Sequence, residues 1–89
     1  MRAVILRIAG SVQGVFFRAT AKEQADALGV KGWAKNCSDG SVEIHAEGMD
    51  DAIRQFIAWC HRGPPAARVE KVLAHETDTQ GCEDFTIKQ

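Results

Sequence analysis

The amino-acid sequence predicts an α+β fold in which two helices cover one face of an antiparallel sheet. Three observations support this prediction. The chain has 89 residues, which suffice for a single domain spanning 1–89. Its hydrophobic fraction of 45% is typical of a folded protein rather than a disordered one. Its apolar patterns follow the order strand, helix, strand, strand, helix, strand, with a short final strand, which is the order of a ferredoxin-like αβ sandwich.

The first strand and the first helix flank a loop that contains glycine. Alternating residues predict the strand, and its strongly apolar face consists of Val4, Leu6 and Ile8. After the loop, apolar residues recur at helical spacing, namely Phe17, Ala21, Ala25 and Leu28. Gly29 comes directly after them and is placed to end the helix.

The middle of the chain predicts a β-hairpin. Residues 31–37 form the second expected strand, and residues 42–47, which alternate between apolar and polar, form the third. The Asp39-Gly40 pair between them is a strong turn signal, because both residue types tolerate the positive φ angles of tight hairpin turns. Gly48 interrupts the third strand.

The second helix is predicted to begin near Asp50 and Asp51, whose charges suit the positive end of a helix. Its apolar stripe consists of Ile53, Phe56, Ile57 and Cys60. Residues 61–64, in the order His-Arg-Gly-Pro, are typical of a helix end.

Two further strands complete the predicted sheet. We expect the fourth strand over 68–76, a polar loop over 77–81 and a last strand over 82–88. In the last strand, Phe85 and Ile87 are expected to point inward.

The charge of the chain disfavours two classes of partner. The formal net charge is −1, and the lysines and arginines are scattered. A nucleic-acid or anionic-membrane partner would call for a basic block, so neither is expected. No apolar run approaches the ~20 residues of a membrane span, and the run near the N-terminus is too short for a signal peptide. We therefore expect a cytoplasmic protein.

The three cysteines, Cys37, Cys60 and Cys82, are odd in number and widely spaced. They form no C-x-x-C pair, so neither a zinc site nor a thioredoxin-like motif is indicated. Three reduced, partly buried thiols are the favoured interpretation, with one disulfide as the alternative.

Residues 10–18, with the sequence G-S-V-Q-G-V-F-F-R, are the most informative segment. They lead from a strand through two glycines into a helix start. A turn of this kind directs several backbone N–H groups into one small space at the positive end of the helix, which attracts a phosphate or carboxylate. The guanidinium of Arg18 suits a tetrahedral oxyanion. Alternatively, the glycines only form a tight turn and the arginine is a solvated surface group.

No conventional catalytic group is evident in the sequence. The serines lack the surroundings of a nucleophile elbow, and no carboxylate pair or metal-ligand cluster stands out. His45, His61 and His75 are far apart, and we expect each to be structural or solvated, with His45 on the polar face of a strand. Positioning and electrostatics alone could nevertheless promote phosphoryl transfer from an acyl phosphate. The departing carboxylate, with a conjugate acid of pKa about 4, needs no proton at neutral pH.

Such a reaction needs a neutral amide or hydroxyl that holds the attacking water near the anion. Asn36 is the candidate, because it ends a predicted strand just before the hairpin turn. Turn chemistry is the alternative role, since asparagine is common beside hairpins.

Two long segments together resemble the signatures of the acylphosphatase family. Residues 10–18 match its first signature. The run G-W-A-K-N-C-S-D-G-S-V at 32–42, with Gly48 beyond it, matches its second. Residues 63–66 and Val69 are similar to the family's loop and strand after the second helix. The resemblance extends over nearly the whole chain.

The resemblance implies hydrolysis of the carboxyl–phosphate bond of small acyl phosphates without a metal or organic cofactor. Inorganic phosphate would be both product and inhibitor. Arg18 would bind the phosphate, and Asn36 would orient the attacking water. The backbone of a phosphate-binding loop at the end of the first strand would come from Gln13, Gly14, Val15, Phe16 and Phe17. We expect a monomer that binds neither nucleic acid nor membrane.

Two positions depart from the family pattern. Cys37 stands beside Asn36 where several relatives have a hydroxyl residue, and a thiol is a weaker hydrogen-bond partner. Lys88 stands where the family often has arginine. The alternative function is a non-catalytic phosphate- or anion-binding regulatory module, since one fold serves many functions. A nucleic-acid binder on the same sheet is disfavoured by the lack of a basic stripe and of an aromatic-rich strand.

Overall fold

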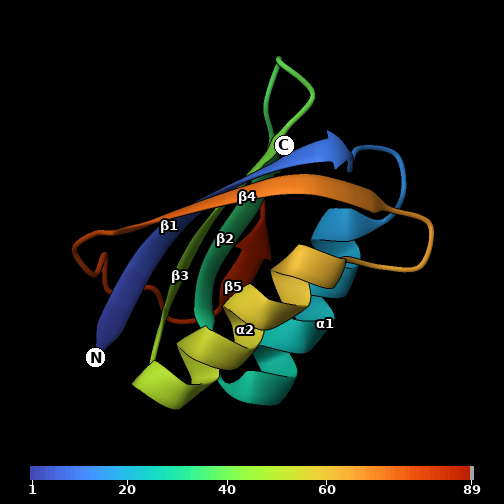
Figure 1. Cartoon of the computed structure of the whole chain (residues 1–89). Helices are drawn as coiled ribbons and strands as arrows, with labels where there is room; N and C mark the ends of the chain where they lie inside the picture. The colour runs from blue at the N-terminus through green and yellow to red at the C-terminus, as the bar shows by residue number, and fades with distance from the viewer. Residues whose placement is uncertain (89) are drawn as a thin grey trace.

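Two helices pack side by side on one face of a five-stranded sheet (Figure 1). The computed structural model describes residues 1–88. Its elements, in chain order, are β1 (Arg2–Ser11), α1 (Phe17–Leu28), β2 (Lys31–Asn36), β3 (Val42–Gly48), α2 (Asp50–Arg62), β4 (Arg68–Glu76) and β5 (Phe85–Ile87). The predicted α+β, ferredoxin-like class is therefore confirmed.

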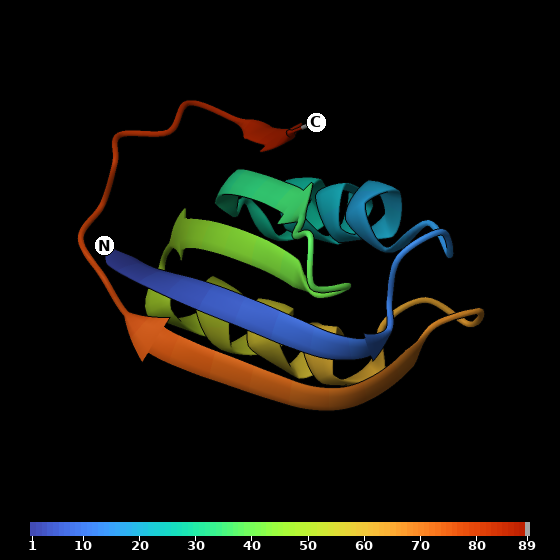
Figure 2. The same cartoon turned by 90° about the horizontal axis from the view of Figure 1, so that it is seen from above.

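The strands are arranged in the order β4-β1-β3-β2-β5. β1 pairs antiparallel with β3 and β4, and β2 pairs antiparallel with β3. β5 differs from the antiparallel expectation, because it pairs parallel with β2 and makes the sheet mixed. The segment after β4 passes around the end of the sheet where β1 and β2 begin (Figure 2). β5 must then start at that end and run in the same direction as β2.

The helix boundaries follow the signals in the sequence. Gly29, with φ of 76°, caps α1 through its backbone N–H, which bonds to the carbonyls of Ala25 and Asp26. α2 has Asp50 and Asp51 in its first turn, as predicted from the helix dipole. Gly63 caps α2 through an N–H bond to the carbonyl of Trp59. Sequence signals therefore mark both ends of α2 and the end of α1.

The last strand is shorter than the predicted 82–88. Phe85 is buried as expected, but Ile87 remains 36% exposed. The backbone N–H of Cys82 donates to a carboxylate oxygen of Glu47 at 3.2 Å instead of entering a strand ladder. The N–H of Gln80 donates to the same carboxylate. The course of this loop is therefore set by a side chain of β3, which no local pattern in 77–84 reveals.

The core lies between the helices and the sheet, and aromatic side chains link its parts. The Phe17 ring at the start of α1 lies 5.3 Å from the Trp59 ring of α2, and the Phe56 ring lies 5.8 Å from that of Phe85. Phe17, Phe56 and Phe85 are each at most 2% exposed. Full burial of one such side chain contributes about 1.5–3 kcal/mol. These contacts fix the first turn of α1 against the rest of the molecule.

Over residues 1–88, no helix combines the length and the apolar character that a membrane crossing needs. All three cysteines are free thiols, and Cys60 is buried in the core.

Candidate active site

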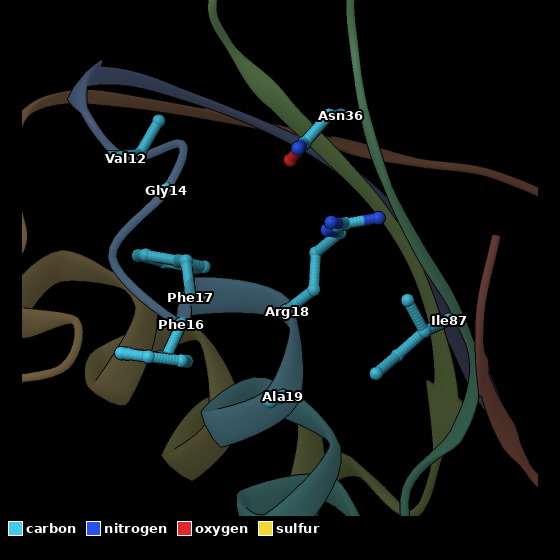
Figure 3. A pocket seen from close by; sticks show the side chains of 8 residues that line it. All are labelled: Val12, Gly14, Phe16, Phe17, Arg18, Ala19, Asn36 and Ile87. Atoms are coloured by element: carbon cyan, nitrogen blue, oxygen red, sulfur yellow. The ribbon is translucent and has the colours of Figure 1, made fainter. Parts of the chain in front are cut away.

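A pocket of about 290 Å³ lies where the loop after β1, the first turn of α1 and the end of β2 meet (Figure 3). Its lining consists of Val12, Gly14, Phe16, Phe17, Arg18, Ala19, Asn36 and Ile87. The fold thus brings Arg18 and Asn36, proposed from sequence as the two functional side chains, to one cavity.

The exit from β1 requires glycine. The register of β1 against β4 shifts between Ala9 and Gly10, which is a bulge. Gly10 has φ of 130°, and a Cβ placed there would lie 2.1 Å from the carbonyl oxygen of Arg68. Only glycine permits this close approach. The bulge turns the chain out of the sheet and into the loop that bounds the pocket.

The loop leaves its backbone donors free. Gly14 has φ of 75° and Phe16, the residue before α1, has φ of 64°, which is unusual for a residue with a side chain. Among the residues that the structure describes, no acceptor is found for the backbone N–H groups of 13–18. The first turn of α1 also contains no acidic residue that would neutralise the positive end of the helix. The loop is therefore ready to bind an anion.

Arg18 extends from the first turn of α1 toward Asn36 (Figure 3). Its side chain is half-buried, and Nη1 donates a bond of 3.1 Å to the backbone carbonyl of Lys88. Within the part of the chain described by the structure, its other guanidinium N–H groups have no acceptor. They remain available for a bidentate contact with an oxyanion.

Asn36 is held by the backbone of the hairpin. It is the last residue of β2 and pairs with Val42 of β3. The next residue, Cys37, receives a bond of 3.1 Å from Gly40 N–H at its carbonyl and donates its own N–H to the carbonyl of Ser41 at 2.8 Å. These backbone bonds position Asn36, so the thiol at position 37 is not needed for that purpose. The Asn36 amide is directed toward the pocket (Figure 3).

Gln13 connects the loop to the same hairpin. Its side-chain Nε2 donates to the carbonyls of Cys37 at 2.8 Å and Ser41 at 2.9 Å. The side chain of Gln13 therefore lies against the hairpin rather than in the pocket lining. Val15 packs against the core and is also absent from that lining. A substrate-binding role for these two residues remains a prediction about their backbone N–H groups.

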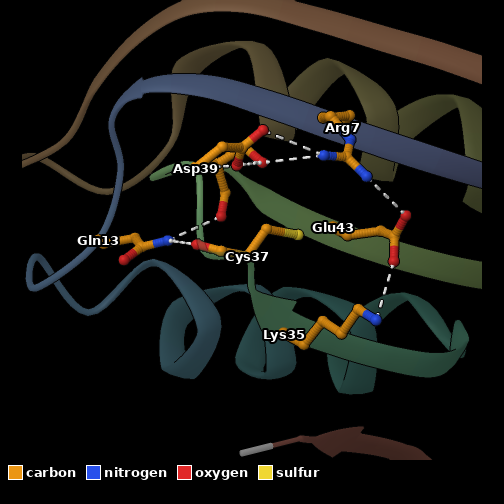
Figure 4. A network of polar contacts seen from close by, with 7 residues as sticks. Arg7, Gln13, Lys35, Cys37, Asp39 and Glu43 are labelled. Atoms are coloured by element: carbon orange, nitrogen blue, oxygen red, sulfur yellow. Dashed lines mark hydrogen bonds and ion pairs between the residues drawn. The ribbon is translucent and has the colours of Figure 1, made fainter.

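A polar network stabilises the outer side of the hairpin (Figure 4). Asp39 Oδ1 accepts bonds from the Ser41 hydroxyl at 2.6 Å and the Ser41 N–H at 3.0 Å. These two donors, with the nearby Arg7 guanidinium, hold the pKa of Asp39 below its ordinary value. Arg7 also pairs with Glu43, which in turn pairs with Lys35.

Comparison with known proteins decides the family. A family model described as Acylphosphatase matches residues 4–87. The chain belongs to the acylphosphatase family. An acylphosphatase of Thermotoga maritima is 51% identical over 88 residues, which cover 99% of this chain and 98% of the relative. The family makes the protein an acylphosphatase enzyme, and hence a hydrolase.

Solved acylphosphatase structures share the whole fold. The crystal structure of the acylphosphatase from Bacillus subtilis superimposes with a TM-score of 0.97 at 34% identity and covers 100% of both chains. The acylphosphatase from Coxiella burnetii gives a TM-score of 0.94 at 37% identity, covering 98% of this chain and 92% of that one.

The pocket also includes residues that were not among the predicted site residues. Val12, Ala19 and Ile87 contribute apolar surface, and the carbonyl of Lys88 braces Arg18. Ile87 was expected to point into the core. That expectation is wrong, because Ile87 is 36% exposed and lines the pocket.

Proposed function

We propose that this acylphosphatase hydrolyses the carboxyl–phosphate bond of small acyl phosphates by in-line attack of water, without a cofactor. The observation that carries the proposal is the meeting of Arg18 and Asn36 at one pocket beside a loop of free backbone N–H groups. One group of donors suits a phosphate, and the neutral amide suits a water molecule.

The phosphate would be bound by electrostatics. Its oxygens would accept bonds from the loop N–H groups of 14–18 and from the Arg18 guanidinium, at the positive end of α1. The hydrogen bonds from these donors become stronger as negative charge develops on the oxygens of the phosphoryl group during its transfer. One well-placed donor of this type contributes ~10²–10³ in rate.

The pocket suits a reaction that requires no general acid. Apart from Arg18, none of the described residues that line it is titratable. The water oxygen would form a bond to phosphorus while the bond from phosphorus to the acyl oxygen breaks. The carboxylate leaves with the electron pair, and both protons of the water stay on the product as dihydrogen phosphate. Because the carboxylate is a weak base, with a conjugate acid of pKa about 4, its departure needs no proton at neutral pH.

Asn36 would hold the attacking water. Its amide oxygen can accept a bond from water, and an amide cannot be protonated or become charged in this pH range. Orientation of the water in line with the leaving group lowers the entropic part of the barrier.

Hydrolysis of benzoyl phosphate by the purified chain tests the proposal. We expect turnover that persists in excess chelator and competitive inhibition by inorganic phosphate, because phosphate fits the loop without an acyl group. The rival function, a regulatory anion-binding module, predicts phosphate binding in calorimetry with no hydrolysis of any acyl phosphate. Absence of turnover together with tight phosphate binding would favour that rival.

We further propose a monomer that acts in the cytoplasm and does not bind nucleic acid. The three free thiols support a reducing compartment, and the net charge of −1 gives no attraction to phosphate backbones. Size-exclusion chromatography with light scattering tests the monomer, and filter binding at low salt tests the absence of nucleic-acid binding.

A further inference from the structure

A second cluster of functional side chains lies on the face of the sheet away from the helices. It consists of His45 and Glu47 of β3 and Cys82 of the loop before β5, and is called the β3 cluster below. One potential ligand atom from each residue lies within 4.8 Å of the other two. His45 was expected to be structural or solvated on the polar face of its strand, and the solvated alternative is wrong because His45 is 0% exposed.

The loop after β4 buries these side chains. Glu47 accepts the backbone N–H groups of Gln80 and Cys82, and Trp33 Nε1 donates to the side chain of Gln80 at 3.1 Å. The ring of Trp33 stacks on that of His45, with centroids 5.9 Å apart. Glu47 is 2% exposed, and Cys82 is half-buried at the edge of the cluster. The side chains of the β3 cluster are therefore held in place by neighbouring residues and largely shielded from solvent.

Only one of the two ring nitrogens of His45 is hydrogen-bonded, so the ring proton can be relocated when a cation binds. Nε2 lies 2.6 Å from Glu47 Oε2, whereas buried Nδ1 has no hydrogen-bond partner among the described residues. In the metal-free protein the Glu47 carboxylate accepts a hydrogen bond from Nε2–H, so Nδ1 is the unprotonated ring nitrogen. A cation at Nε2 would take the place of this proton, and the ring proton would move to Nδ1, where no existing hydrogen bond opposes it. In Glu47, Oε1 accepts only the N–H of Cys82 and retains acceptor capacity.

We propose that His45, Glu47 and Cys82 form a binding site for a Zn²⁺-like divalent cation. Imidazole, carboxylate and thiolate are the ligand types that Zn²⁺ takes, and three protein ligands leave a fourth position for water. Bonds of ~2.0–2.3 Å in a tetrahedral site place ligand atoms roughly 3.3–3.6 Å apart. His45 Nε2 and Glu47 Oε2, which are 2.6 Å apart, must move apart to admit the cation, and ligand atoms at separations up to 4.8 Å must move closer. Calcium and magnesium prefer oxygen ligands and are disfavoured.

The Glu47 hydrogen bonds would support the metal. The N–H groups of Gln80 and Cys82 orient the carboxylate, as outer-sphere donors do in metal sites. Binding would displace the proton of the Cys82 thiol to solvent, so that the Cys82 thiolate and the Glu47 carboxylate together neutralise the divalent cation, and no oxidant is needed. The cation would join β3 to the loop that leads into β5.

The β3 cluster is separate from the acyl phosphate pocket. Val42 pairs with Asn36 at one end of β3, whereas Glu47 lies near the other end, ~17 Å away at ~3.4 Å per residue. Metal binding and hydrolysis can therefore be measured independently, and failure of one leaves the other intact.

Co²⁺ and Zn²⁺ titrations of the full chain under reducing conditions test the proposal. We expect one Co²⁺ per chain with a near-ultraviolet thiolate charge-transfer band, and Zn²⁺ binding that displaces it. Cys82→Ser should remove the band and weaken Zn²⁺ binding at least tenfold. Cys37→Ser is the matched control, since Cys37 is the other half-buried thiol, and it should retain both. Absence of the band in the unmodified chain, or its persistence in Cys82→Ser, would overturn the site.

Histidine ring spectra give a second readout that needs no variant. On addition of Zn²⁺, the imidazole ¹⁵N signals of His45 should shift, while those of exposed His61 and His75 should not. A shift confined to His61 or His75 would show adventitious surface binding and would contradict the proposal. This measurement tests His45 as a ligand without a substitution at a buried position.

Discussion

Arg18 Nη1 donates a hydrogen bond of 3.1 Å to the backbone carbonyl of Lys88. The N–H of Lys88 in turn donates to the carbonyl of Ala34 in β2 at 2.8 Å. One residue after β5 therefore links the proposed phosphate ligand to the strand that ends at Asn36. The side chains proposed to bind phosphate and water are thus positioned from a common support, although they lie on different elements.

Arg18→Ala should lower kcat/KM for benzoyl phosphate by ~10²–10³, because a charge-assisted donor to the phosphate is removed. Phosphate inhibition should weaken in parallel. The fold should persist, since the bond to Lys88 is at the surface and typically contributes about 1 kcal/mol. Steady-state kinetics and circular dichroism measure these effects.

Arg54→Ala is the control for the loss of positive charge. Arg54 is exposed on α2 and pairs with Asp50 and Asp51, away from the pocket. This variant should keep its activity. Unchanged kinetics in a folded Arg18→Ala protein would remove the arginine from the mechanism.

Asn36→Ala should separate turnover from phosphate binding. If the amide orients water, kcat should fall by ~10²-fold or more while the inhibition constant of phosphate stays within about threefold, because the phosphate donors are untouched. Asn36→Asp keeps the shape but brings a negative charge next to the phosphate, so it should also weaken phosphate inhibition. Equal losses of kcat and phosphate affinity in Asn36→Ala would identify Asn36 as a phosphate ligand.

Gln13→Ala tests the connection between the loop and the hairpin. Loss of the two bonds to the carbonyls of Cys37 and Ser41 should destabilise the fold by about 1–2 kcal/mol. Activity should fall moderately, by roughly tenfold, because the loop donors and Asn36 are no longer fixed relative to each other. Urea unfolding and kinetics provide the measurements.

Gln55→Ala serves as the comparison for Gln13→Ala, since Gln55 is exposed on α2. Its stability should stay within about 0.5 kcal/mol of the unmodified chain, as for most surface substitutions. A Gln13→Ala protein that is as stable and as active as Gln55→Ala would show that these two hydrogen bonds do not position the site.

Local signals sufficed to predict much of this fold. Gly29 and the acidic start of α2 gave the helix boundaries, and the Asp39-Gly40 pair gave the hairpin that places Asn36. Each of these features depends on residues close together in the chain. The loop that we propose to bind phosphate could be delimited for the same reason, because its glycines and Arg18 lie within one short segment.

Features that depend on distant residues were missed. The length and direction of β5 depend on the loop before it. The backbone of this loop is held by hydrogen bonds from the N–H groups of Gln80 and Cys82 to Glu47, which is far away in the sequence. The burial of His45 has the same origin, because alternation in β3 correctly puts it on the outer face but cannot reveal the loop that covers it. For the same reason, no spacing of residues in the sequence indicated that Cys82 lies near His45 and Glu47.

The pKa of Asp39 should report on the hairpin. The Ser41 hydroxyl is the largest cause that lowers this pKa below 3.8. The unfolded chain therefore binds a proton at higher pH than the folded chain does. The stabilisation from ionised Asp39 is fully present above about pH 3.8 and is lost as the pH falls through the lower, folded-state value.

Ser41→Ala should raise the midpoint of the Asp39 titration toward 3.8 without reaching it, because the Ser41 N–H and Arg7 still favour the carboxylate. The stability of this variant should consequently fall less steeply with acidification over that range. Carbon-detected NMR titration of the Asp39 carboxyl measures the midpoint. Ser38→Ala, in the same hairpin and exposed, should leave it unchanged. An unaltered midpoint in Ser41→Ala, or an equal change in Ser38→Ala, would show that the hydroxyl bond does not hold this turn.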